Sequence, residues 1–278
     1  MLRLGEDNIL TVDRETTVGM FLTDGEGNDV LLPNKYVDDD IKIGDEITVF
    51  VYLDSNERII ATNIEPYLKL NQFAYLEAKQ NTEFGMFMDW GLEKDLLVPF
   101  REQGSDMEKG KWYVVYLYLD SETNRLVGST RTSRHIETEN IELEEGQKVE
   151  ILITGKTDLG WNVIINNLYR GLIYHNEIFK EIFPGDITNA YVKKVREDGK
   201  IDISLQKVGY DGIEPLSVKI INQLIKHSGF LPLTDKSSPQ EILLTFEMSK
   251  KTFKKAIGSL YKQKIIKIEE DGIYLNEE

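Results

Sequence analysis

Hydrophobic and polar residues alternate along most of this chain, which is the pattern of half-buried β-strands. The clearest copy of the pattern predicts strands over residues 83–90, 94–99, 112–119 and 125–130, with a lead-in strand near Leu76. Polar turns separate these strands. Five strands in about 65 residues make a sheet too small to leave both faces in water, so we expect it to close into a barrel.

The same unit occurs three times. Gly19-Met20-Phe21-Leu22 reappears 66 residues later as Gly85-Met86-Phe87-Met88, and a fainter copy starts at Gly160, 141 residues after Gly19. A second glycine repeats at the same spacings, as Gly44, Gly110 and Gly185. A strand-rich repeat of this length predicts a tandem array of small β domains.

The apolar spacing becomes helical after residue 214. Pro215 to Lys226 carries an apolar stripe, Ser238-Pro239-Gln240-Glu241 starts a second helix with a capping box, and Ser249 caps a third. One face of the third helix is expected to consist of Phe253, Ala256, Ile257, Leu260 and Tyr261. Residues 265–268 and 273–275 predict a final β-hairpin.

The fold class is therefore predicted as mainly β with a C-terminal α+β domain. We expect barrels over residues 1–66, 67–146 and 147–212, and the α+β domain over residues 213–278.

The repeated unit resembles the S1 RNA-binding domain, a five-stranded OB-fold barrel. The second copy carries the aromatic pair Phe84 and Phe87 around a glycine, and the third carries Gly185-Asp186 and the closing strand Ile201-Asp202-Ile203-Ser204-Leu205. Pro33 and Pro99 stand where the family often has histidine, and Tyr174 stands there in the third copy. The resemblance implies single-stranded RNA stacked on aromatic rings.

The order helix, helix, tight turn, helix, hairpin over residues 215–278 resembles a winged helix-turn-helix. Between residues 250 and 267 there are seven lysines and no acid, namely Lys250, Lys251, Lys254, Lys255, Lys262, Lys264 and Lys267. The apolar stripe turns Lys251, Lys254, Lys255 and Lys262 away from the core, toward the face that such a domain offers to nucleic acid. A plain solvated helix face is the alternative.

Charge is unevenly distributed. The net charge of −15 divides into −10 for residues 1–66, −6 for 67–146, −1 for 147–214 and +2 for 215–278. Because phosphate contacts need cations, the C-terminal half is the expected RNA-binding half. The acidic barrels are expected either to keep the protein soluble or to bind a protein partner.

No constellation for catalysis is visible. The chain has no cysteine and no phosphate-binding glycine loop, and its three histidines lie in different units. We therefore expect no enzyme activity, metal or cofactor. No stretch is long enough to cross a bilayer and the N-terminus lacks an apolar signal core, so a cytoplasmic location without membrane contact is expected.

The expected RNA contacts combine aromatic and basic residues. The aromatic set is Phe21, Phe84, Phe87, Trp161 and Tyr174, with His175 beside it, and the basic set of the third copy is Arg170, Lys193, Lys194, Arg196 and Lys200. Strand alternation puts Phe84 and Phe87 on opposite faces, so one of them is expected in the core. Core packing is the alternative for every aromatic.

Across its whole length the chain resembles the bacterial conserved virulence factor B family (CvfB, also called YitL). This resemblance implies a cytoplasmic RNA-binding protein that affects gene expression without catalysis. Two alternatives remain: a DNA-binding transcriptional regulator that acts through the winged helix, and a non-catalytic scaffold for a basic protein partner.

Overall fold

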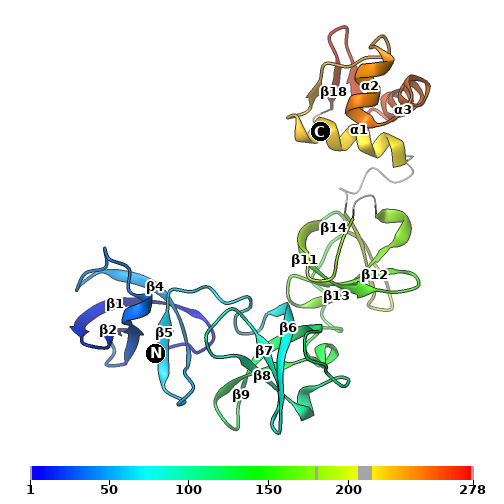
Figure 1. Ribbon diagram of the computed structural model, residues 1–278. Coiled ribbons are helices and arrows are strands. Elements are labelled where there is room, and N and C mark those ends of the chain that lie inside the picture. Colours follow the sequence, from blue (N-terminus) through cyan, green and yellow to red (C-terminus); the bar gives the residue numbers. More distant parts are fainter. Residues whose placement is uncertain (1, 179–180, 206–214, 277–278) are drawn as a thin grey trace. The chain divides into compact units, whose positions relative to one another are not determined.

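The computed structural model describes residues 2–178, 181–205 and 215–276 (Figure 1). They divide into two compact units, one within Met1–Leu205 and the other within Gln206–Glu278. The described part of the first unit consists of strands and short 3-10 turns, whereas the second combines helices with a small sheet. The predicted fold class is confirmed.

The first barrel is closed, with the strand order β1-β2-β3-β5-β4. Its strands are β1 (Asp7–Thr16), β2 (Gly19–Thr23), β3 (Asp29–Pro33), β4 (Glu46–Leu53) and β5 (Ile59–Thr62). β1 pairs with both β2 and β4, while β3 pairs with β5 in parallel. The inward residues of the alternation, among them Leu10, Leu22 and Leu32, form the barrel's core.

The second five-stranded unit remains open along one seam, so the expectation that its strand pairing closes into a barrel is wrong for this unit. It consists of β6 (Phe73–Thr82), β7 (Gly85–Asp89), β8 (Leu96–Pro99), β9 (Trp112–Asp120) and β10 (Arg125–Ser129). The order β10-β9-β6-β7-β8 leaves β8 and β10 as the two edges. These edges still lie side by side, because a Cβ on Gly128 would meet the side chains of Val98 and Leu96. The predicted strands are confirmed, with boundaries that differ by no more than two residues.

The third barrel is closed, with the order β11-β12-β13-β15-β14. Its strands are β11 (Lys148–Lys156), β12 (Gly160–Ile165), β13 (Tyr169–Tyr174), β14 (Ile187–Val195) and β15 (Ile201–Ser204). The strands of all three units fall within the predicted ranges 1–66, 67–146 and 147–212, whose boundaries stay predictions. The boundary between 212 and 213 lies outside the described residues.

All three units bend their first strand at the same place. The pairing of first and second strands shifts register after Val12, Ala78 and Ile153, which follow the repeat spacings. At each shift the carbonyl oxygen accepts a hydrogen bond from the second repeated glycine, Gly44, Gly110 or Gly185. These glycines have φ values of +96°, +78° and +96°, in the left-handed region. A bulge bends its strand, so this contact helps the first strand pair with two neighbours.

The compact unit within Gln206–Glu278 has the elements of a winged helix. They are α1 (Pro215–Lys226), β16 (Phe230–Leu231), α2 (Pro239–Phe246), α3 (Lys250–Lys262), β17 (Ile266–Ile268) and β18 (Ile273–Leu275). The predicted capping box is present, since the backbone N–H of Glu241 donates to Ser238 Oγ at 3.2 Å and that of Ser238 donates to Glu241 Oε2 at 2.8 Å. The strands form a sheet in the order β16-β18-β17, and β16 is the element that the sequence did not predict.

One residue of α3 departs from the expected core face. Phe253, Ala256, Ile257 and Leu260 are buried, but Tyr261 is 56% exposed. At 100° per residue, Tyr261 lies about 90° round the helix from the centre of the buried stripe. It therefore stands at the border between the core and the lysine-rich side.

Candidate nucleic-acid interface

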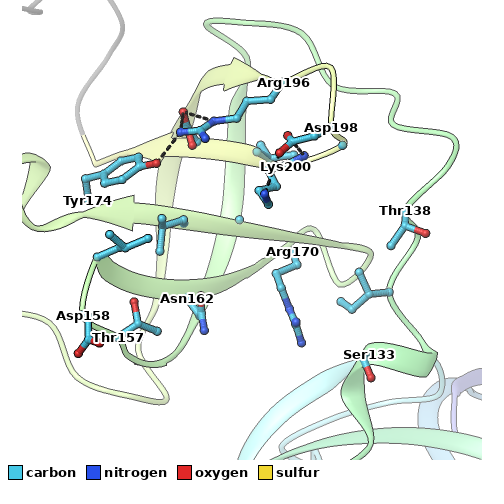
Figure 2. Close-up of a pocket in the computed structure, with 17 residues that line it drawn as sticks. Ser133, Thr138, Thr157, Asp158, Asn162, Arg170, Tyr174, Arg196, Asp198 and Lys200 are labelled. Atoms are coloured by element: carbon cyan, nitrogen blue, oxygen red, sulfur yellow. Dashed lines mark hydrogen bonds and ion pairs between the residues drawn. The ribbon is translucent and has the colours of Figure 1, made fainter.

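The third barrel carries a cavity of about 690 Å³ on one side of its sheet (Figure 2). Its floor is formed by β12, β13 and β15, and its rims by two loops, residues 157–159 and residues 196–200. The first loop joins barrel strands one and two, and the second joins strands four and five. OB-folds bind oligonucleotides over strands two and three between these two loops. The cavity, hereafter the groove, therefore occupies the position of an oligonucleotide site.

Four of the predicted contacts come together in the groove. Its lining includes Arg170, Tyr174, Arg196 and Lys200. In Figure 2, Tyr174 lies at one end of the view and Arg170 in the middle, with Arg196 and Lys200 above them. These residues come from β13 and from the 196–200 loop, so the barrel topology brings together positions that are far apart in sequence.

Arg196 is already occupied by protein partners. Its guanidinium donates to Asp202 Oδ2 from Nε at 3.0 Å and from Nη2 at 2.9 Å, and Nη2 also donates to the Tyr174 hydroxyl. The hydrogen bond to Asp202 is the main cause that raises the pKa of Arg196 above its ordinary value. Arg196 thus holds the Tyr174 ring in position rather than offering a free charge.

Arg170 differs from the other groove cations. Within the described ranges its side chain is exposed and has neither a hydrogen-bond nor an ion-pair partner. The repeat spacings place it at the position of Asp29 in the first barrel and Asp95 in the second. Those carboxylates face cations on the first strand: Arg14 lies 2.8 Å from Asp29, and Lys79 lies 3.8 Å from Asp95. The third barrel has Thr154 and Gly155 there instead, which leaves an unpaired cation on its groove face.

The groove as a whole is not strongly basic. Its three cations are accompanied by three carboxylates, those of Asp158, Asp198 and Asp202. Lys200 Nζ lies 2.7 Å from Asp198 Oδ2, and this hydrogen bond is the first cause that lowers the pKa of Asp198. Attraction of a polyanion by the groove therefore depends on Arg170, while Leu159, Leu172 and Tyr174 offer apolar and aromatic surface.

Trp161 and Asn162 lie on opposite sides of β12. Trp161 packs against the core of the third barrel, as its counterparts Met20 and Met86 do in theirs. Asn162 lines the groove at the position of Phe21 and Phe87. The aromatic ring of the groove is therefore that of Tyr174, and Asn162 is a groove residue that the 141-residue spacing from Phe21 could have identified.

The other predicted residues of the third barrel lie outside the groove lining. His175 is exposed, and its Nε2 donates to the carbonyl oxygen of Thr157 at 3.1 Å. Lys193 Nζ lies 2.6 Å from Glu177 Oε1. Lys194 is exposed on β14.

The aromatic residues of the first two barrels face outward. Phe21 is half-buried beneath the Arg14 guanidinium, 4.3 Å from the ring centroid. Phe87 is also half-buried, whereas Phe84 is 63% exposed. The expectation that Phe84 or Phe87 belongs to the core is wrong, because Phe84 lies in the turn before β7 and strand alternation does not reach it.

The winged helix carries an exposed row of lysines. Lys251, Lys254, Lys255 and Lys262, hereafter the lysine face, are exposed as the apolar stripe of α3 predicts. Lys254 Nζ lies 3.5 Å from the half-exposed carboxylate of Asp235. Lys264 and Lys267 are exposed beyond the helix, and Lys250 is half-buried with its Nζ donating to the carbonyl oxygen of Lys236 at 3.3 Å.

The described residues contain neither a cluster of metal-ligating side chains nor a helix suited to cross a membrane. Their histidine, aspartate and glutamate side chains nowhere gather into a group of three or more that could hold a metal ion. None of the helices in this part of the chain combines the length and the apolar character that a bilayer crossing requires.

Models of two domain families match the sequence. The S1 domain matches residues 4–63, and the CvfB-like winged helix domain matches residues 218–275. Both are families of nucleic-acid-binding domains rather than of catalytic ones. The domains at residues 4–63 and 218–275 are therefore of the nucleic-acid-binding class.

Relatives match along almost the whole chain. YitL of Bacillus subtilis is 30% identical over 274 residues, which are 94% of this chain and 90% of YitL. Conserved virulence factor B of Staphylococcus epidermidis is 28% identical over 246 residues, covering 86% of this chain and 82% of that protein. A solved multidomain protein with nucleic acid binding domains from Streptococcus pneumoniae aligns over 98% of both chains, at 24% identity and a TM-score of 0.42.

Proposed function

The chain belongs to the family of YitL and conserved virulence factor B, and we propose that it binds single-stranded RNA through the groove of the third barrel and the lysine face. It acts without catalysis, in the regulation of gene expression in the cytoplasm. The observation that carries the proposal is Arg170, an unpaired exposed cation in an OB-fold groove next to the Tyr174 ring.

The groove suits an unpaired strand better than a duplex. Single-stranded binding combines bases stacked on aromatic rings with cations along the backbone, at about 1–3 kcal/mol per stacked base. Tyr174 supplies the ring and Arg170 supplies the phosphate contact. Because Arg196 holds the hydroxyl of Tyr174, the ring is fixed before the RNA arrives, which reduces the entropy lost on binding.

The lysine face adds a second, sequence-tolerant contact on the same chain. Lysine side chains bind phosphates as point charges and do not read bases in a fixed geometry. Two weak sites on one chain strengthen each other, because binding at one raises the effective concentration of RNA at the other. The proposal therefore needs only modest affinity at each site.

The experiment is a fluorescence anisotropy titration of the full chain with a short unstructured RNA. Arg170→Asp restores the residue found in the first two barrels and should weaken binding about tenfold, through loss of one charge-assisted contact and gain of a repulsion. Lys148→Asp is the matched control, since Lys148 is exposed at the start of β11 and outside the groove lining. Equal loss in both variants would contradict a specific role for the groove.

Competition separates RNA from DNA. Unlabelled single-stranded RNA should displace the probe, whereas duplex DNA of matched length should displace it poorly. Better displacement by duplex DNA would instead support the DNA-binding regulator that acts through the winged helix.

A protein partner is the second function that we propose, for the acidic N-terminal barrels. Phe84 lies opposite Phe100, one position beyond the paired Gly85 and Pro99, and the two phenyl rings are 63% and 54% exposed. Residues 1–146 carry a net charge of −16, the sum of −10 and −6. Arginine side chains stack on aromatic faces and pair with carboxylates, so a basic segment of another protein suits this surface.

An arginine-rich peptide tests this second function. The double variant Phe84→Ser/Phe100→Ser should weaken peptide binding about tenfold, while Ile9→Ser/Ile43→Ser changes two similarly exposed apolar residues of the first barrel as a control. If single-stranded RNA displaces the peptide, Phe84 is an RNA contact, as the sequence predicts, rather than part of a protein-binding surface.

A further inference from the structure

One wall of the groove does not belong to the third barrel. Ser133, Ile136 and Thr138 line it, and they lie in the chain that connects β10 to β11. In Figure 2, Ser133 and Thr138 lie on the side away from Tyr174, with Arg170 between them and the tyrosine. An isolated OB-fold barrel would lack this wall.

Aromatic stacking fixes the connection to the second five-stranded unit. The His135 ring lies against that of Tyr116, with centroids 4.1 Å apart and an interplanar angle of 18°, and it also stacks on Tyr118 at 5.6 Å. The neighbouring Ile136 packs against a buried cluster that includes Phe73 and Leu152, one from each unit.

One backbone hydrogen bond and close packing hold the same connection to the third barrel. The backbone N–H of Glu137 donates to the carbonyl oxygen of Leu168 at 2.9 Å, just before β13 begins. Beside it, the N–H of Phe73 donates to Asn167 Oδ1 at 2.8 Å. The carbonyl oxygen of Thr138 lies 3.4 Å from the Cβ position of Gly199 in the 196–200 loop. The wall is thus held on both sides rather than hanging free.

We infer that this connection, residues 133–138, is a binding element of the RNA site, so that the strand is gripped between the third barrel and the connection. The inference rests on the proposed function of the groove. A cavity of about 690 Å³ lies within the range of about 300–1,000 Å³ that encloses drug-sized ligands. A nucleotide is of that size, so the groove fits an unstacked nucleotide whose phosphate contacts Arg170 and whose base stacks on Tyr174, while the wall bounds the strand on the other side of Arg170 (Figure 2).

Lysines placed on the wall test the inference. Ser133 and Thr138 are exposed, so Ser133→Lys/Thr138→Lys changes no core residue and should tighten binding of a short unstructured RNA about fivefold. Ser133→Glu/Thr138→Glu should weaken it by a similar factor. The matched control is Ser121→Lys/Thr123→Lys, which adds the same charge to the exposed turn between β9 and β10.

The possible results distinguish failure of this inference from failure of the proposed RNA-binding function. If both lysine pairs change binding equally while Arg170→Asp still weakens it, residues 133–138 are not a binding element, but the groove still binds RNA. Absence of RNA binding by the unmodified chain would overturn the proposed function and the wall together. Thermal unfolding of each variant checks that the fold is retained.

Discussion

The imidazole of His135 lies nearly parallel to the ring of Tyr116, with 4.1 Å between the ring centroids. Its Nε2 is buried and has no hydrogen-bond partner in the described structure. Burial lowers the pKa of His135 below its ordinary value, and the nearby Arg134 adds to this effect, while Glu102 opposes it. The connection between the second and third five-stranded units therefore contains a histidine that packs in its neutral form.

We expect His135 to make the free energy of unfolding of the compact unit within Met1–Leu205 fall as the pH is lowered from 7 to 5. The folded pKa lies below the unfolded value of about 6.5, so the unfolded chain takes up the proton first. The stabilisation is present above that value and is lost as the pH falls through it. Urea unfolding at a series of pH values measures the effect, and His135→Phe, which retains a ring for stacking, should show a shallower pH dependence. Identical slopes for the two proteins would contradict the prediction.

Gly155 and Gly160 lie in the same hairpin of the third barrel, but only Gly160 is too crowded to accept a Cβ. A Cβ on Gly160 would overlap the carbonyl oxygen of Ile173, just as it would overlap Leu32 at Gly19 and Val98 at Gly85. Gly155, five residues earlier, has no atom within 4 Å of its Cβ position and is not in the left-handed region. Gly160→Ala should therefore destabilise the third barrel by about 2–4 kcal/mol, and Gly155→Ala by less than about 1 kcal/mol. Urea unfolding of both variants checks this, and similar losses would contradict it.

Much of the fold was predictable because strand and helix periods are local properties of the sequence. The capping box at Ser238 needed only neighbouring residues, and it was predicted. The short strand β16 was missed because it pairs with β18, more than 40 residues away, and has too few residues to show a period.

The groove shows the same division between local and distant information. Arg170 and Tyr174 could be chosen by residue type and by their place in the repeat. The wall residues Ser133 and Ile136 could not, because their place in the groove depends on how the connection packs against the third barrel. Asn162 is not among the predicted contacts because its amide is not an aromatic ring, although it holds the position of Phe21.

Two substitutions of Tyr174 distinguish stacking from the hydroxyl contact. Tyr174→Ala removes the ring and should weaken single-stranded RNA binding by about 1–3 kcal/mol, or about fivefold to more than a hundredfold. Tyr174→Phe keeps the ring and removes only the acceptor for Arg196, so it should cost about threefold or less, since Arg196 keeps its bonds to Asp202. Anisotropy titration at fixed salt measures both. Equal losses would place the contribution of Tyr174 in its hydroxyl rather than its ring.

The salt dependence of RNA binding measures how many phosphates the lysine face neutralises. Each phosphate neutralised on a single strand makes the slope of log K against log salt concentration steeper by about 0.7, since that slope is negative. Lys251→Gln/Lys254→Gln/Lys255→Gln should therefore reduce the magnitude of this slope by up to about 2. The matched control is Lys219→Gln/Lys226→Gln/Lys236→Gln, which removes the same charge from exposed positions of the same unit outside α3. An unchanged slope in the first variant, or an equal reduction in the control, would mean that phosphates do not contact this face in preference to the rest of the domain.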